Sequence, residues 1–160
     1  MREIHTMAGH LIRRLNQISV GVFTDRMTDL GVDLSPVQFA ALVEMRAHPG
    51  IDQATLAGAI AYDKATLGKV IDRLEDRGLL TRAVSTRDRR ARTLAITEKG
   101  ERLLETVFPE IEAFQAEILS GLSDLERDTL LLLLEKTTTA GNEKSRAPLR
   151  SVPRDEHPQA

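Results

Sequence analysis

The hydrophobic pattern of this 160-residue chain is mainly helical. Apolar residues recur three and four positions apart over several stretches, as they do on the buried face of an amphipathic helix. Ser35, Asp52, Asp63, Thr97 and Ser123 precede these stretches, and each can cap a helix N-terminus with its side-chain oxygen. We therefore predict helices over residues 7–30, 36–48, 53–60, 64–77, 98–118 and from 124 onwards, with a bend or break at Pro109.

The helix that follows Asp63 has two distinct faces. Its apolar stripe consists of Leu67, Val70, Ile71 and Leu74. The opposite face carries small, hydroxylated and cationic residues, namely Ala65, Thr66, Lys69 and Arg73. Such a face suits a helix that enters the major groove of DNA, and an ordinary solvated helix surface is the alternative.

An arginine-rich hairpin follows that helix. Residues 80–84 and 93–96 have the pattern of two β-strands. The residues between the strands include four arginines and one acid, namely Arg87, Asp88, Arg89, Arg90 and Arg92. So much positive charge at a loop tip is unfavourable unless an anion meets it. A helix followed by a basic hairpin predicts a winged helix-turn-helix, which is a mainly α fold with a small β-hairpin wing (α+β) that reaches for the DNA backbone or minor groove.

The hairpin also carries a recognisable motif. Asp88-x-Arg90-x-x-x-Leu94-x-Ile96-Thr97, followed by Glu98-Lys99-Gly100, resembles the DxRxxxLxLT wing signature of the MarR transcriptional regulators, with Ile in one Leu position. The resemblance covers roughly residues 9–134. It implies that Arg90 enters the minor groove, oriented by the Asp88 carboxylate, while Arg87, Arg89 and Arg92 contact phosphates or solvent. The chain departs from the family at Gly68, where a hydroxyl residue is common.

The charge distribution agrees with a DNA-binding region. The whole chain has a net charge of −2. Residues 63–102 nevertheless carry 11 Lys or Arg against 7 Asp or Glu, so the positive charge is concentrated in the predicted helix and wing. Because affinity for phosphate depends on local charge, the acidic total is no objection to DNA binding.

The sequence argues against several other classes of protein. It has no cysteine, which excludes disulfides, thiolate zinc sites and cysteine-based oxidant sensing. No metal site is predicted, because its histidines, His5, His10, His48 and His157, lack the spacing of a helical metal clamp; a metal-responsive regulator is kept as an alternative. Neither a phosphate-binding glycine loop nor a nucleophile motif is present, so we expect no cofactor and no enzyme. No apolar run is long enough for a membrane span, and the first residues lack a signal-peptide core, so we expect a cytoplasmic protein.

The last predicted helix indicates a homodimer. Residues 130–134 are five leucines in succession, which cover every side of a helix, and a small domain cannot bury all of them alone. The resemblance agrees, because MarR proteins interdigitate their first and last two helices across a two-fold axis. We therefore predict long dimerisation helices in residues 1–34 and 98–140, a DNA-binding domain in residues 35–97, and a flexible tail in the proline-rich residues 141–160.

An effector site is implied by the resemblance alone. Members of the family commonly hold small anionic aromatic molecules between the dimer helices and the winged domain. The candidates are His10 and Arg14, which share one face of the first helix, with Phe39 and Leu42 as an apolar wall. Salt bridges between domains or subunits are an equally open role for His10 and Arg14.

The resemblance implies a repressor that a small-molecule effector releases, with an aromatic acid or its CoA thioester as the candidate class. Its partner is double-stranded DNA with a pseudo-palindromic operator, whose half-sites lie about 10 bp apart, one helical turn. A winged helix that serves only for protein contacts is the alternative.

Overall fold

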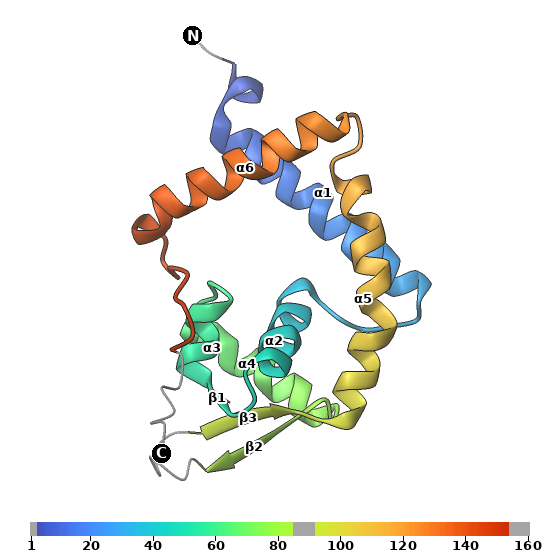
Figure 1. The fold of residues 1–160 in the computed structure, drawn as a ribbon, viewed down its shortest axis with the longest axis vertical. Helices are drawn as coiled ribbons and strands as arrows, with labels where there is room; N and C mark the ends of the chain where they lie inside the picture. Colours follow the sequence, from blue (N-terminus) through green and yellow to red (C-terminus); the bar gives the residue numbers. More distant parts are fainter. Residues whose placement is uncertain (1–2, 85–91, 154–160) are drawn as a thin grey trace, which may run out of the picture.

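Helices dominate the fold, as the computed structural model shows for residues 3–84 and 92–153 (Figure 1). The helices are α1 (Ala8–Asp29), α2 (Pro36–Ala47), α3 (Gln53–Ala59), α4 (Lys64–Asp76), α5 (Glu98–Ile118) and α6 (Asp124–Gly141). Short 3₁₀ turns precede α1 and follow α6, namely η1 (Ile4–Thr6) and η2 (Asn142–Lys144). The strands are β1 (Ile51–Asp52), β2 (Leu80–Val84) and β3 (Arg92–Ile96). The predicted fold class is confirmed, and within the described residues no helix is long and apolar enough to cross a membrane.

The predicted caps begin the helices. At α2 the Gln38 amide donates to Ser35 Oγ at 3.3 Å, and the Ser35 amide donates to Gln38 Oε1 at 2.9 Å. At α5 the Gly100 amide donates to Thr97 Oγ1 at 3.1 Å. Gly78, which follows the C-cap Arg77 of α4, has a φ of +69°, in the left-handed region that glycine adopts without a steric penalty. Local sequence therefore sets where these helices start and stop.

The sheet has one strand more than the predicted hairpin. β2 and β3 pair antiparallel as expected, with Leu80 opposite Ile96 and Val84 opposite Arg92. β1 adds to the other edge of β3, which gives the order β1-β3-β2. Two residues are too few to show an alternating pattern, so periodicity did not reveal β1. Its place is set by tertiary contacts, because the Ile51 side chain is buried in the core beside Leu94.

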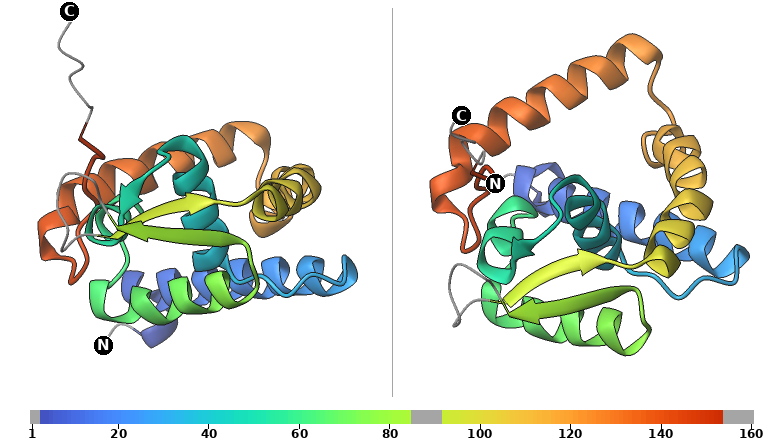
Figure 2. Two further views of the ribbon diagram at one scale, coloured as in Figure 1. Left: turned by 90° about the horizontal axis from the view of Figure 1, so that it is seen from below. Right: turned by 60° about the horizontal axis from the view of Figure 1, so that its bottom comes forward.

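The elements form a winged domain at one end and a frame of long helices at the other (Figures 1 and 2). α2, α3, α4 and the sheet surround a core in which Leu42, Met45, Leu56 and Leu94 are completely buried. α5 runs from the sheet to the far end of the molecule and packs along α1 on the way. It is one continuous helix through Pro109, so the break that this proline could have caused does not occur.

α6 differs from the other helices because none of its residues is buried in the protomer. Leu131, Leu132 and Leu133 expose 54%, 65% and 52% of their surface. Leu11, Ile12 and Ile18 of α1 are also exposed. An apolar surface of this extent is typical of a face that a partner subunit covers.

Part of the predicted flexible tail has a defined position. The segment from Asn142 to Pro153 turns back from α6 and reaches α3, where the Arg150 amide donates to Gly58 O at 2.9 Å. The half-buried Val152 packs against the hydrophobic core. In this structure paired polar groups and this one valine give the segment its position, and its flexibility stays a prediction from its composition.

Candidate nucleic-acid interface

α4 presents the predicted recognition face to solvent. Ala65, Thr66, Lys69 and Arg73 are all exposed, and among the described residues Lys69 and Arg73 form no ion pair. The opposite side of the helix carries Leu67, Ile71 and Leu74, which are completely buried. The buried leucines and isoleucine fix the rotation of α4, so the outward direction of the cationic side chains is set by the core.

Thr66 also has a structural role. Its backbone amide and its hydroxyl both donate to Asp63 Oδ1, at 2.9 and 2.8 Å. These hydrogen bonds, the one from the Thr66 hydroxyl first, hold the pKa of the Asp63 carboxyl below its usual value. The hydroxyl proton of Thr66 is thus engaged in the cap of α4. Towards DNA, the Thr66 hydroxyl oxygen can only accept a hydrogen bond.

Arg82 of β2 joins the wing to the recognition helix. Its guanidinium forms ion pairs with Asp72 and with Glu75, the latter at 3.1 Å. Both acids lie on α4, one turn apart, so a single arginine holds the helix at two points. No sequence signal marks this residue, because nothing in the local pattern shows that β2 passes beside that face of α4.

The end of the wing motif holds the hairpin against the C-terminus of α4. Thr97 Oγ1 donates to Gly78 O at 2.7 Å, and Lys99 Nζ donates to Arg77 O at 2.7 Å. Gly100 packs so closely that a Cβ there would lie 2.4 Å from Leu79 O. These contacts give a structural reason for Thr97, Lys99 and Gly100, which follow the wing and are remote from its tip.

The wing tip lies largely outside the described residues. This applies to Arg87, Asp88, Arg89 and Arg90, so their contacts stay predictions. Arg92 is described: it begins β3, opposite Val84, and its side chain is exposed. Gly68 on α4 has room for a side chain, because a Cβ there would meet only Gln53 Nε2 at 3.6 Å.

The proposed effector residues do not come together in the protomer. His10 and Arg14 belong to the N-terminal half of α1, the half that lies away from the winged domain (Figure 1), and His10 Nδ1 lies 3.5 Å from Arg13 Nη2. Leu42 is completely buried in the core, so it offers no surface to a ligand in this conformation. Phe39 is half-buried. Helical periodicity does not distinguish a core position from a pocket wall, so the ligand-binding role of Phe39 and Leu42 stays a prediction.

An aromatic cluster surrounds Phe39 instead. All four phenylalanines of the chain take part in it. Phe39 lies 5.8 Å from Phe108 and 6.2 Å from Phe23, which in turn lies 6.0 Å from Phe114, centroid to centroid. The Arg46 guanidinium stands 5.2 Å above the Phe108 ring, within the range of a cation–π contact. The cluster joins α1, α2 and α5, where the winged domain meets the long helices.

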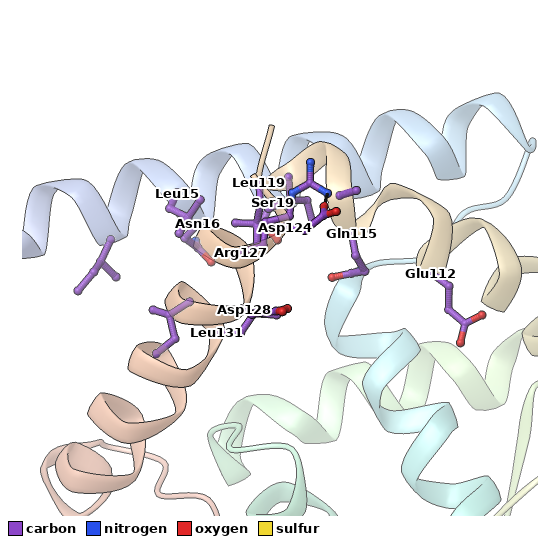
Figure 3. Close-up of a pocket in the computed structure, with 14 residues that line it drawn as sticks. Leu15, Asn16, Ser19, Glu112, Gln115, Leu119, Asp124, Arg127, Asp128 and Leu131 are labelled. Atoms are coloured by element: carbon purple, nitrogen blue, oxygen red, sulfur yellow. Dashed lines mark hydrogen bonds and ion pairs between the residues drawn. The ribbon is translucent and has the colours of Figure 1, made fainter. Parts of the chain in front are cut away.

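A separate hollow of about 730 Å³ lies between α1, α5 and α6 (Figure 3). Leu15 and Ser19 of α1 face Arg127 and Leu131 of α6 across it. None of the predicted effector residues lines it. The exposed apolar surfaces of α1 and α6 lie on the helices that enclose it, so it belongs to the predicted dimerisation region. No group of three or more possible metal ligands occurs in the part of the chain that the structure describes.

Comparisons with known proteins agree with this arrangement. A sequence model of the MarR family matches residues 34–91. The HTH-type transcriptional repressor NicR of Pseudomonas putida is 31% identical over 134 residues, which make up 84% of each chain. The structure of Bordetella bronchiseptica BpsR, described with the regulation of its DNA binding by 6-hydroxynicotinic acid, is 30% identical and has a TM-score of 0.80. That similarity covers 86% of this chain and 97% of BpsR.

A third similar structure contains DNA. It is the transcriptional repressor CouR bound to a 23-mer DNA duplex, with 26% identity, a TM-score of 0.74 and coverage of 86% of this chain and 99% of CouR, a protein of Rhodococcus jostii RHA1. The winged domain, the wing motif and relatives aligned over most of both chains lead to one conclusion. This chain belongs to the MarR family of transcriptional regulators.

Proposed function

We propose that the protein is a homodimeric repressor that binds a pseudo-palindromic operator, with α4 in the major groove and the wing at the minor groove or backbone. The observation that carries this proposal is the exposed cationic face of α4, which Arg82 joins to the arginine-rich hairpin. Lys69 and Arg73 supply base or phosphate contacts from the helix, while Arg90 and its neighbours supply them from the wing. Similar proteins that are named as repressors, one of them solved on DNA, support the same function.

The apolar surfaces of α1 and α6 support the dimer. Leu132 alone exposes 65% of its surface in the protomer, and neighbouring leucines add to the patch. Burial of such side chains contributes about 1.5–3 kcal/mol each, which makes an unpaired α6 unfavourable in water. A two-fold dimer presents two copies of α4, which meet half-sites about 10 bp apart, one helical turn of DNA. A protein with this role is expected to act in the cytoplasm, and the role needs neither a cofactor nor catalysis.

The aromatic cluster supports regulation by a small aromatic acid. It lies where α2 of the winged domain meets α1 and α5, so a ligand inserted there changes how the two parts pack. Phe39 and Phe108 offer ring faces for stacking, and Arg46 offers a positive charge to a carboxylate. His10 and Arg14 belong to this site only if the dimer or a shift of α1 brings them near. The similar protein BpsR responds to an acid of this class.

The ligand releases the protein from DNA because it binds one packing of the winged domains more tightly than the other. A ligand that binds a non-DNA spacing of the two α4 helices more tightly shifts the population toward that spacing. To raise the fraction of protein in the non-DNA spacing from 1% to 99%, the ligand must bind that state about 10⁴-fold more tightly than the DNA-binding state. An acid that binds both states equally has no effect on DNA affinity.

The test is a fluorescence-anisotropy titration with duplex DNA from the region upstream of the protein's own gene. We expect saturable binding that weakens steeply between 50 and 200 mM salt, by about 10³-fold or more if six or more phosphates are contacted. A panel of hydroxylated benzoic and nicotinic acids is then added, and one of them should release the DNA. A DNA affinity that does not change with salt concentration overturns the proposal. So does the absence of binding even at low salt, which favours the alternative of a protein-interaction module.

A further inference from the structure

The C-terminal segment links the last dimerisation helix back to the winged domain. This segment, residues 142–153, is called the strap. In Figures 1 and 2 the chain leaves α5, passes along α6 and returns through the strap to α3, so its path forms a closed ring. α5 is the direct covalent connection between the winged domain and α6, and the strap is a second connection at the far end of α6.

The strap is folded on itself before it reaches α3. Asn142 Nδ2 donates to Leu149 O at 3.1 Å, and the Leu149 amide donates to Asn142 Oδ1 at 2.8 Å. Arg150 donates two hydrogen bonds to the Glu143 carboxylate, at 2.5 and 2.9 Å. These bonds hold the pKa of Glu143 below its usual value. Asn142 and Glu143 at the start of the strap therefore pair with Leu149 and Arg150 near its end and close a loop of fixed shape. A loop that is already ordered loses less conformational entropy when it docks.

The strap contacts the winged domain at the C-terminal end of α3. Gly58 O accepts from the Arg150 amide at 2.9 Å and also from the Ala61 amide at 3.1 Å. Gly58 permits this approach, because a Cβ there would lie 3.0 Å from Arg150 Cβ. Val152 follows and is half-buried against the hydrophobic core. The strap thus supplies a donor to one of the last carbonyls of a helix and an apolar anchor beside it.

From this geometry we propose that the strap restrains the position of the winged domain relative to α6. α6 has no buried residue of its own in the protomer. A domain held at two points has a narrower range of positions than one held by α5 alone. When the strap detaches, the winged domain moves about the α5 connection. Under the proposed repressor function, that movement sets the spacing of the two α4 helices.

Distances between spin labels test the restraint directly. The chain has no cysteine, so Asp76→Cys on α4 and Lys136→Cys on α6 give one pair of labels per protomer. Labelled chain is mixed with an excess of unlabelled chain, which leaves one labelled protomer in most dimers. The distance distribution is then measured without DNA or ligand in four backgrounds: the full chain, a chain ending at Gly141, Val152→Asp and Leu149→Asp.

Val152→Asp and the truncation should each broaden the distribution about twofold. Val152→Asp places a charge at the half-buried anchor, whereas Leu149→Asp makes the same charge change at an exposed side chain three residues away, and it should leave the distribution unchanged. Equal widths in the full chain and in Val152→Asp overturn the proposal. So does equal broadening by Leu149→Asp, which would assign the effect to charge. Val152→Asp keeps the test decisive if the truncated chain does not fold, and no outcome depends on DNA binding.

Discussion

Gly100→Ala and Gly68→Ala make the same chemical change in two helices, and we expect opposite effects on stability. Alanine in a helix interior is favoured over glycine by about 0.5–1 kcal/mol. At Gly68 the added Cβ meets only Gln53 Nε2, at 3.6 Å, which is an ordinary contact. Nothing opposes the helix preference there, so Gly68→Ala should stabilise the protein by about 0.5–1 kcal/mol.

Sterics decide the sign at Gly100. The added Cβ would lie 2.4 Å from Leu79 O and 2.7 Å from Ile96 Cγ1. A backbone carbonyl cannot rotate away as a side chain does, and Leu79 O also accepts the Thr97 amide at 3.1 Å, so its displacement strains that bond. Overpacking of this kind costs about 1–3 kcal/mol, which exceeds the helix gain. Gly100→Ala should therefore destabilise the protein.

Thermal unfolding by circular dichroism measures both effects, at one protein concentration because the melting temperature of a dimer depends on concentration. For a chain of this size, 1 kcal/mol moves Tm by about 2–4 °C. We expect Gly68→Ala to melt about 1–4 °C above the parent and Gly100→Ala about 2–8 °C below it. A Gly100→Ala protein that melts at or above the parent would refute the close packing of α5 against the end of α4.

Three further predictions concern the interface, the cap and the dimer. Lys69→Ala should weaken operator binding and lower the salt slope by about 1 with Tm unchanged, and Arg90→Ala should also weaken binding with folding intact; unchanged affinity would remove these residues from the interface. The carboxyl of Asp63 has a lowered pKa in the folded protein, so its stabilising contribution is present above about pH 4 and is lost as the pH falls through the folded pKa. The stability difference between the parent and Asp63→Asn, measured by urea unfolding, should accordingly shrink below pH 4, and a difference that grows there would contradict the cap. Leu132→Glu should convert the dimer to monomer in sedimentation experiments, because that side chain is exposed in the protomer and a partner must cover it.

The wing motif shows both the reach and the limit of sequence reasoning. It identified the family and the hairpin, and the two predicted strands pair antiparallel. The local pattern predicted Thr97 as a helix cap, but it did not predict the contacts that Thr97, Lys99 and Gly100 make with the carbonyls of residues 77–79, which lie about twenty residues earlier in the chain. Arg82 was overlooked for the same reason, since its partners belong to α4.

The effector residues and the strap mark a second limit. Phe39 and Leu42 were paired as a pocket wall, but one is half-buried in an aromatic cluster and the other lies in the core. The flexibility of the strap stays a prediction from its polar composition; the contacts of Asn142, Glu143 and Val152 that give it a position were not predicted. Composition measures how much apolar surface a segment has, whereas docking depends on whether a matching site exists elsewhere.

The sequence by itself determined the helices, their caps, the basic hairpin and the concentration of positive charge, because each depends on residues within a few positions of one another. The tertiary structure alone decided the third strand, the ion pairs of Arg82 with α4, whether Gly68 and Gly100 have room for a side chain, and the path of the strap. These features depend on which distant segments meet when the core forms. Gly68 and Gly100 are alike in sequence terms, and only the carbonyl that packs against Gly100 distinguishes them.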